Sequence, residues 1–155
     1  MNQPSDISEP IIEALYSEAL VLADEVRSVF DLRHVAGADF DGDRLRFAMS
    51  VEGLRTTTRI MHVLAWLLNQ RAYLSGDMTE FQLRRHGTLP LDRPSDPENL
   101  AILEKPTRDL IEATETLHGR VSRLDKAWRA GFAGRPSGIR DLHERLGREL
   151  RVVGH

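Results

Sequence analysis

The sequence predicts an all-α protein, an antiparallel three-helix bundle with a long central helix and a short C-terminal amphipathic helix. Three long segments carry apolar residues at alternating spacings of three and four, which is the period of a helix buried on one side. Stretches containing Gly and Pro separate these segments, and no stretch has the two-residue alternation of a strand. We expect residues 1–130 to form the bundle domain and residues 131–155 to form a linker and an amphipathic tail.

The first helix is predicted to begin after Ser8, a good N-cap, and to end near Asp31. Pro10 stands in its first turn, where a missing N–H costs nothing. Its apolar stripe consists of Ile12, Leu15, Tyr16, Ala19, Leu22, Ala23, Val26, Val29 and Phe30. This is the pattern of a helix that packs on a bundle.

The central helix is predicted to span Arg44 to Gly76, the longest segment without Pro. At 100° per residue, most of its apolar side chains fall on one broad arc, joined by Thr57 and Thr58. That arc is expected to face the core because it is too wide for a two-helix seam. Its other members are Val51, Leu54, Ile60, Met61, Leu64, Ala65, Leu67, Leu68, Ala72 and Leu74.

The opposite arc of the central helix is polar, yet it contains Trp66 and Tyr73. Arg, Trp and Tyr dominate binding energy at protein interfaces because they combine contact area with directional hydrogen bonds. We therefore predict a partner-binding surface on this arc, with help from Leu142 and Leu146 of the tail. The alternative is that a loop of the same chain covers Trp66. The predicted site on the central helix is Arg55, Arg59, His62, Trp66, Asn69 and Tyr73.

Shorter elements follow. A helix over Met78–Arg85 is predicted to be capped by Thr79 with Gln82, and a helical turn over Pro97–Glu104 by Asp96. The third long helix should span Pro106–Ala130, with a seam of Leu110, Thr114, Leu117, Val121, Leu124 and Trp128. After the linker GFAGRPSG, an apolar stripe of Ile139, Leu142, Leu146 and Leu150 predicts a tail helix that must dock on the bundle or on a partner.

Composition excludes several classes of function. The chain has 155 residues and no cysteine, so disulfides, thiolate catalysis and Cys-based zinc sites are excluded. A net charge of −3 does not suit a protein that binds nucleic acid. No signal peptide and no run long enough to span a bilayer are apparent, so we expect a cytoplasmic protein that does not enter a membrane.

No pattern of residues predicts catalysis, a metal site or a cofactor. Glu115 and His118 have the Glu-x-x-His spacing of di-iron bundles, but such a site needs a second pair, which no other helix supplies. His118 is therefore interpreted as a residue on the helix flank. Arg71 falls on the predicted core side and is expected to pair with a buried carboxylate, with Asp24, Glu25 or Asp125 as candidates.

The run LRTTTRIMHVLAWLLNQRAYLSGDMT, Leu54 to Thr79, resembles the central signature of the bacterial regulator of CtrA degradation (RcdA-like) family. The flanking helices agree with that family in layout rather than in motif. The resemblance implies a cytoplasmic helical homodimer without a cofactor. It also implies an adaptor that delivers substrates to the ClpXP protease in cell-cycle control, after a response regulator has primed the protease. The family's tails are polar, whereas this tail reads as an amphipathic helix.

The predicted function is therefore a non-enzymatic adaptor or scaffold. Its expected partners are proteins, namely the protease or its response-regulator primer, the substrates and a second copy of the chain. The alternative is a helical bundle that binds a small ligand in a groove among Thr58, Met61 and Ala65.

Overall fold

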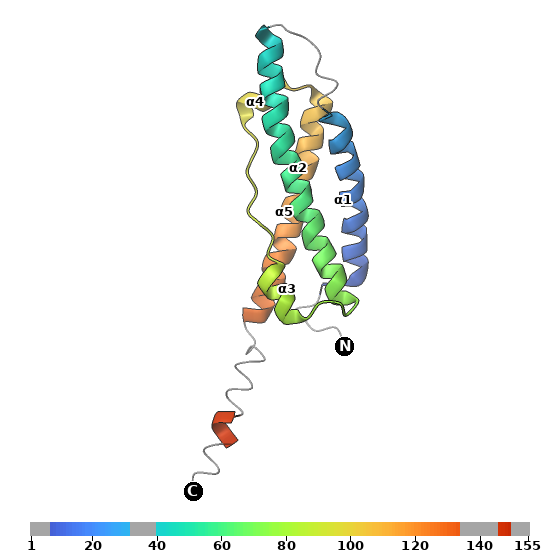
Figure 1. The fold of residues 1–155 in the computed structure, drawn as a ribbon, viewed down its shortest axis with the longest axis vertical. Coiled ribbons are helices and arrows are strands. Elements are labelled where there is room, and N and C mark those ends of the chain that lie inside the picture. The colour runs from blue at the N-terminus through green and yellow to red at the C-terminus, as the bar shows by residue number, and fades with distance from the viewer. Residues whose placement is uncertain (1–6, 32–39, 134–145, 150–155) are drawn as a thin grey trace.

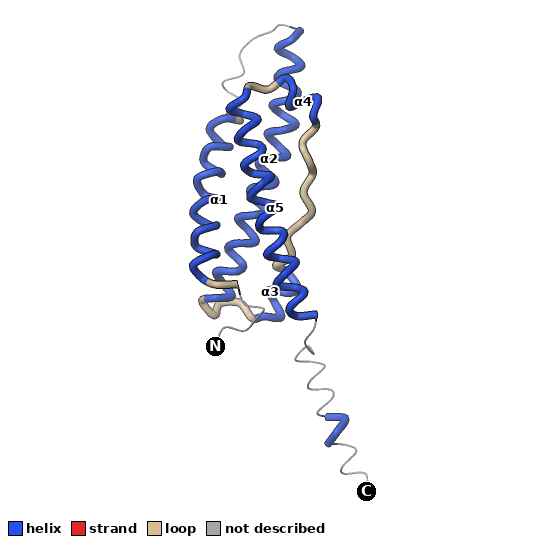
Figure 2. Tube along the Cα trace, turned by 180° about the vertical axis from the view of Figure 1, so that it is seen from behind, coloured by secondary structure: helices blue, strands red, loops and turns tan. Residues whose placement is uncertain are grey.

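The computed structural model describes residues 7–31, 40–133 and 146–149, and these residues form helices and loops without a strand. Figure 1 shows the path of the chain, and Figure 2 shows the same helices from behind. The predicted all-α fold is confirmed. Residues 146–149 are helical, and the longer elements are α1 (Glu9–Val29), α2 (Phe40–Leu74), α3 (Glu80–His86), α4 (Pro97–Ile102) and α5 (Lys105–Ala133).

The bundle consists of α1, α2 and α5, and α1 runs antiparallel to the other two (Figure 1). The helices α2 and α5 run in the same direction, because Arg59 contacts Thr114 and Trp66, further along α2, contacts Asp125. The predicted antiparallel arrangement therefore holds for α1 with α2 and does not hold for α2 with α5. A parallel pair requires the chain to return along the whole bundle between α3 and α4. Residues 87–96 make that return as an extended segment, which we call the strap.

Local signals position the ends of the helices as predicted. Thr79 and Gln82 form a complete capping box at the start of α3, and the Asp96 side chain accepts from the Glu98 amide at the start of α4. Gly76 follows α2 with a φ of 85°, a conformation that residues with a Cβ rarely adopt. Ser8 precedes α1 as its N-cap residue, but its side chain makes no capping hydrogen bond.

The core lies between the three long helices. From α1 it contains Ile12, Leu15 and Ala19, and from α5 it contains Leu117 and Val121, in agreement with the predicted stripes. Burial of each large apolar side chain contributes about 1.5–3 kcal/mol. The contribution of α2 to this cluster is Ile60, Val63, Trp66 and Leu67.

The predicted orientation of α2 is correct for Ile60 and Leu67, which are buried, and wrong for four other members of the predicted core arc. Leu54, Met61, Leu68 and Leu74 are exposed by 37–70%, although they belong to the arc expected in the core. The face that packs on α1 and α5 contains Ile60 and Leu67 together with residues of the arc predicted to meet solvent. It includes Glu52, Thr56, Arg59, Trp66 and Gln70, each exposed by 2% or less.

The strap explains why polar side chains of α2 are buried. An extended segment has backbone groups with no regular partner, so side chains must satisfy them. The buried Glu52 carboxylate accepts from the Asp96 amide at 3.1 Å, and Arg59 Nη2 donates to the carbonyl of Arg93 at 3.0 Å. From α5, His118 Nε2 lies 3.1 Å from the carbonyl oxygen of Pro90. The polar arc of α2 therefore binds the protein's own chain.

Two further expectations are corrected by these contacts. His118 was expected on a helix flank, but it is 7% exposed and packs against the strap. Arg71 pairs with Glu13 of α1 at 2.8 Å, and both side chains are 40% exposed or more, so the expected buried carboxylate is absent from this pair. The Arg71 guanidinium also lies 4.4 Å from the centre of the Tyr16 ring.

Candidate protein-binding surface

The structure divides the predicted partner-binding residues into buried and accessible groups. Arg59 and Trp66 are each 2% exposed inside the bundle, so neither is available on the surface. Arg55, His62, Asn69 and Tyr73 are half-buried at the edge of the same face. The alternative interpretation, that the protein's own chain covers Trp66, agrees with the structure.

Arg59 is the residue of this arc most fully engaged inside the molecule. Its Nε donates to both carboxylate oxygens of Asp92 at 2.8 Å. Its Nη1 donates to Thr114 Oγ1 at 3.1 Å. Because all these partners belong to the strap and α5, Arg59 ties three parts of the fold together.

Of the two tail residues of the predicted site, the structure describes Leu146. Leu146 lies in the helical stretch 146–149 and is 48% exposed. Leu142 lies outside the described residues. The prediction that the tail contributes to this site therefore stays a prediction.

The other face of α2 presents large apolar side chains to solvent at a regular interval. Phe47, Leu54, Met61 and Leu68 follow one another every seven residues and are 66%, 70%, 56% and 48% exposed. Seven residues are close to two helical turns, so these side chains line one side of the helix. We call this face the outer stripe. Its other members are the exposed residues between them, Ser50, Thr57, Thr58 and Ala65.

The outer stripe carries no charge. Every residue of α2 that is exposed between Phe47 and Leu68 is an apolar residue, Ser or Thr. A solvent-facing helix surface normally carries charged side chains opposite its buried face. In α2 the arrangement is reversed, because Glu52 and Arg59 are inside and the apolar side chains are outside.

Phe47 is the member of this surface that sequence reasoning missed. The predicted core arc includes Leu54, Met61 and Leu68 but omits Phe47, although the seven-residue spacing extends back to it. That spacing is the signal that identifies the complete stripe.

The described residues contain neither a group of side chains placed to bind a metal ion nor a helix able to span a membrane. They contain no group of three or more His, Cys, Asp or Glu side chains placed to hold a metal ion. Glu115 instead accepts from Ser95 Oγ at 2.9 Å. In the same part of the chain, no helix is both long enough and apolar enough to cross a membrane.

The groove expected among Thr58, Met61 and Ala65 for a small ligand is not formed within the bundle. All three side chains are exposed on α2. Any ligand at these residues would meet a convex helix surface instead of a cavity between helices.

Comparison with known proteins yields a family match alone. A family model described as "Protein of unknown function (DUF1465)" matches residues 4–150. Neither the curated proteins nor the solved structures contain a match to the chain. The match covers the three long helices and the strap.

Proposed function

The chain belongs to the DUF1465 family of proteins of unknown function, and we propose that it is a non-enzymatic adaptor that binds other proteins. The outer stripe of α2 is the observation that carries this proposal. Four large apolar side chains, each about half exposed or more, stand in one uncharged line. Large contiguous apolar patches on soluble domains mark surfaces that bind a partner.

The length of the stripe favours a protein partner. From Phe47 to Leu68 the helix rises about 32 Å, at 1.5 Å per residue. Covering side chains of this size gains about 25 cal/mol for each Å² of apolar surface removed from water. A partner helix lying along α2 would cover the whole line, whereas a small molecule would cover one turn.

A second copy of the chain is the partner that the spacing fits best. In an antiparallel pair with its twofold axis between Thr57 and Thr58, Phe47 lies opposite Leu68 and Leu54 lies opposite Met61. The small Thr side chains at the axis allow the helices to approach closely. Because the stripe is uncharged, it meets its own copy without like-charge repulsion. We therefore propose that two copies of the chain form a homodimer.

The resemblance of Leu54–Thr79 to the regulator of CtrA degradation family supports a role in regulated proteolysis. We propose that the dimer acts in the cytoplasm and delivers substrates to the ClpXP protease. The dimer would bind either the protease or the response regulator that primes the protease. This role requires protein partners and no cofactor. A dimer joined through α2 leaves the outer faces of α1 and α5 accessible to these partners.

The dimer is tested by sedimentation of the wild-type chain and a Leu54→Glu/Met61→Glu variant at tens of micromolar. The wild type should sediment as a dimer and the variant as a folded monomer, because four buried carboxylates would face one another. The matched control, Ser17→Glu/Ser28→Glu, places two charges at exposed positions of α1 and should remain dimeric. A monomeric wild type would show that a second copy does not cover the stripe.

The adaptor role is tested separately with purified components. The chain is immobilised, and binding of ClpXP with and without the response-regulator primer is measured. Binding that depends on the chain, together with faster degradation of a bound substrate, is the expected result. Absence of both with a correctly dimeric chain would contradict protease delivery while leaving the dimer intact.

A further inference from the structure

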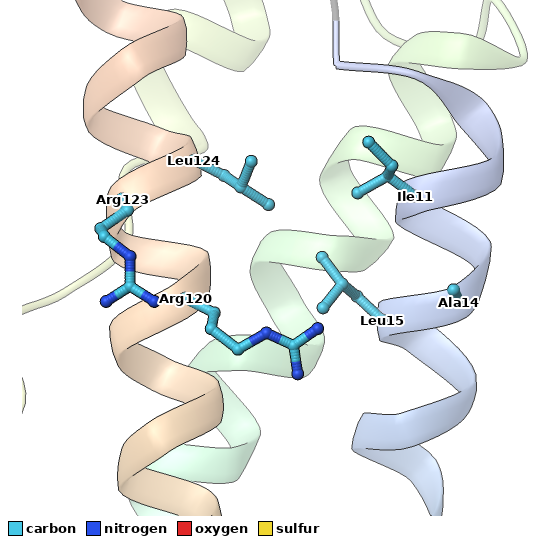
Figure 3. A pocket seen from close by; sticks show the side chains of 6 residues that line it. All are labelled: Ile11, Ala14, Leu15, Arg120, Arg123 and Leu124. Carbon is cyan, nitrogen blue, oxygen red and sulfur yellow. The ribbon is translucent and has the colours of Figure 1, made fainter.

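A groove of about 440 Å³ opens between α1 and α5, with α2 behind it (Figure 3). From α1 it is lined by Ile11, Ala14 and Leu15, and from α5 by Arg120, Arg123 and Leu124. It is separate from the outer stripe, since α2 contributes none of these residues.

The floor of the groove is apolar. In Figure 3 the side chains of Ile11 and Leu15 point from α1 toward Leu124 on α5. Leu15 is 3% exposed and closes the bottom, while Ile11 is 46% exposed at the mouth. An apolar chain placed here would contact all three side chains and cover the exposed part of Ile11.

The edge of the groove is cationic. Arg120 extends from α5 across the gap, and its Nη1 donates to both carboxylate oxygens of Glu18 at 3.0 Å. A guanidinium has five N–H donors, so the Nε and Nη2 groups of Arg120 remain for a second acceptor. Arg123, one turn further, makes no ion pair or hydrogen bond with any residue that the structure describes.

The size of the groove favours a small ligand over a docked helix. Its lining covers five positions on each helix, 11–15 and 120–124, which is about 6 Å of helix axis. A partner helix is recognised through anchors spread over two turns or more. A volume of about 440 Å³ is instead within the range of small-molecule sites, which combine apolar walls with a few polar groups that orient the ligand.

We propose that this groove binds a free single-chain carboxylate, the class of fatty acids. The hydrocarbon chain lies between Ile11, Leu15 and Leu124. The carboxylate accepts hydrogen bonds from the unused donors of Arg120, and charge-assisted bonds of this kind are the strong ones. This site is independent of the protein-binding role of α2.

The test is calorimetric titration of the full chain with decanoate below its micelle-forming concentration. Decanoate should bind with one site per chain, and decyltrimethylammonium, with the same chain length and the opposite charge, should bind at least about tenfold more weakly. Arg120→Met should weaken decanoate binding about tenfold, as loss of a charge-assisted hydrogen bond predicts. Lys126→Met, an exposed residue of α5 that does not line the groove, is the matched control and should bind as the wild type does.

Several results would overturn the proposal. These are no binding at any concentration of monomeric decanoate, equal binding of the cationic amphiphile, or equal weakening by Lys126→Met. Binding to anionic phospholipid vesicles without binding to free decanoate would indicate a membrane surface instead. Ile11→Asn provides a second variant, with lower decanoate affinity expected because it places a polar group at the apolar mouth. The Leu54→Glu/Met61→Glu variant should bind decanoate normally, so failure of this site and failure of the dimer are distinguishable.

Discussion

Trp66 Nε1 donates a 2.9 Å hydrogen bond to the carboxylate of Asp125, which joins the second half of α2 to the second half of α5. The same carboxylate accepts from Arg129 Nε at 3.1 Å. Arg129 Nη1 then donates to the carbonyl of Arg84 in α3. Trp66 is thus one end of a chain of polar contacts that links three helices.

Substitution of Trp66 should reduce stability. Trp66→Ala is expected to lower the free energy of unfolding by about 3–5 kcal/mol, because it removes a fully buried aromatic and leaves a cavity. Trp66→Phe should cost about 1–2 kcal/mol, since Asp125 loses one donor but keeps Arg129. Urea denaturation measures both values, and Thr116→Ala, at an exposed position of α5, is the control. A loss below about 1 kcal/mol for Trp66→Ala would contradict its buried position.

The Arg59–Asp92 pair should hold the strap on the bundle. Arg59→Met is expected to cost about 3 kcal/mol or more, because it removes one partner of an ion pair whose Arg side chain is 0% exposed. Asp92→Asn should cost less, since Asp92 is 23% exposed and its amide oxygen still accepts.

A double-mutant cycle of Arg59→Met and Asp92→Asn, measured by urea unfolding, should give a coupling energy of about 1 kcal/mol or more. Arg93→Ala is the matched control, because the strap uses the Arg93 carbonyl and leaves its side chain exposed. Additive effects in the cycle would mean that the two side chains act independently.

Replacement of Gly53 by a residue with a side chain should lower the stability of the protein. A Cβ at this position would lie 2.9 Å from Phe30 Cδ1, which is closer than real Cβ atoms approach, and 3.2 Å from Cγ, which is a tight contact. Ala is the better helix former by about 1 kcal/mol, but overpacking costs about 1–3 kcal/mol, so Gly53→Ala should be destabilising. The melting temperature should recover in part when Phe30→Leu is added.

Gly119→Ala provides the comparison for that prediction. A Cβ there would have its nearest neighbour, Arg123 Nη1, at 3.6 Å, an ordinary contact. Gly119→Ala should therefore raise the melting temperature through helix propensity alone. If both Ala variants were equally stabilising, this result would contradict the close approach of Phe30, which follows α1, to Gly53 of α2.

Cysteine crosslinking should reveal the direction of the proposed α2 pair, because the chain has no native cysteine. In the antiparallel arrangement, Thr58→Cys lies near the twofold axis and should form a disulfide with its own copy. Leu54→Cys alone should not, because the two copies of residue 54 would be about 10 Å apart along the helices, beyond the reach of a disulfide.

An equimolar mixture of Leu54→Cys and Met61→Cys chains should crosslink under mild oxidation, as judged by non-reducing electrophoresis. Rapid crosslinking of Leu54→Cys by itself would instead indicate a parallel pair. The double-glutamate variant carrying Thr58→Cys serves as the negative control, since it should stay monomeric.

Sequence patterns were sufficient for the presence of the long helices and for three helix ends, although α2 begins at Phe40 and not at the predicted Arg44. The capping box of Thr79 with Gln82, the Asp96 cap and the glycine after α2 all depend on residues a few positions apart. The apolar stripes of α1 and α5 also predict the buried faces of these helices, although Ile11, Leu20 and Val21 of α1 are exposed. Ile12, Leu15 and Ala19 of α1 are buried as predicted.

The orientation of α2 was decided only by the tertiary structure. Both of its faces repeat with a helical period, so periodicity alone does not say which one is inside, and total apolarity favoured the wrong face. The polar face is buried because the strap and α5 place backbone and carboxylate groups against it, where Glu52, Arg59 and Trp66 satisfy them. Those partners lie 44, 34 and 59 positions away in the chain. The sequence by itself determined that α2 has two faces able to be buried, and the crossing of the strap determined which face packs inside the bundle and which one stays exposed.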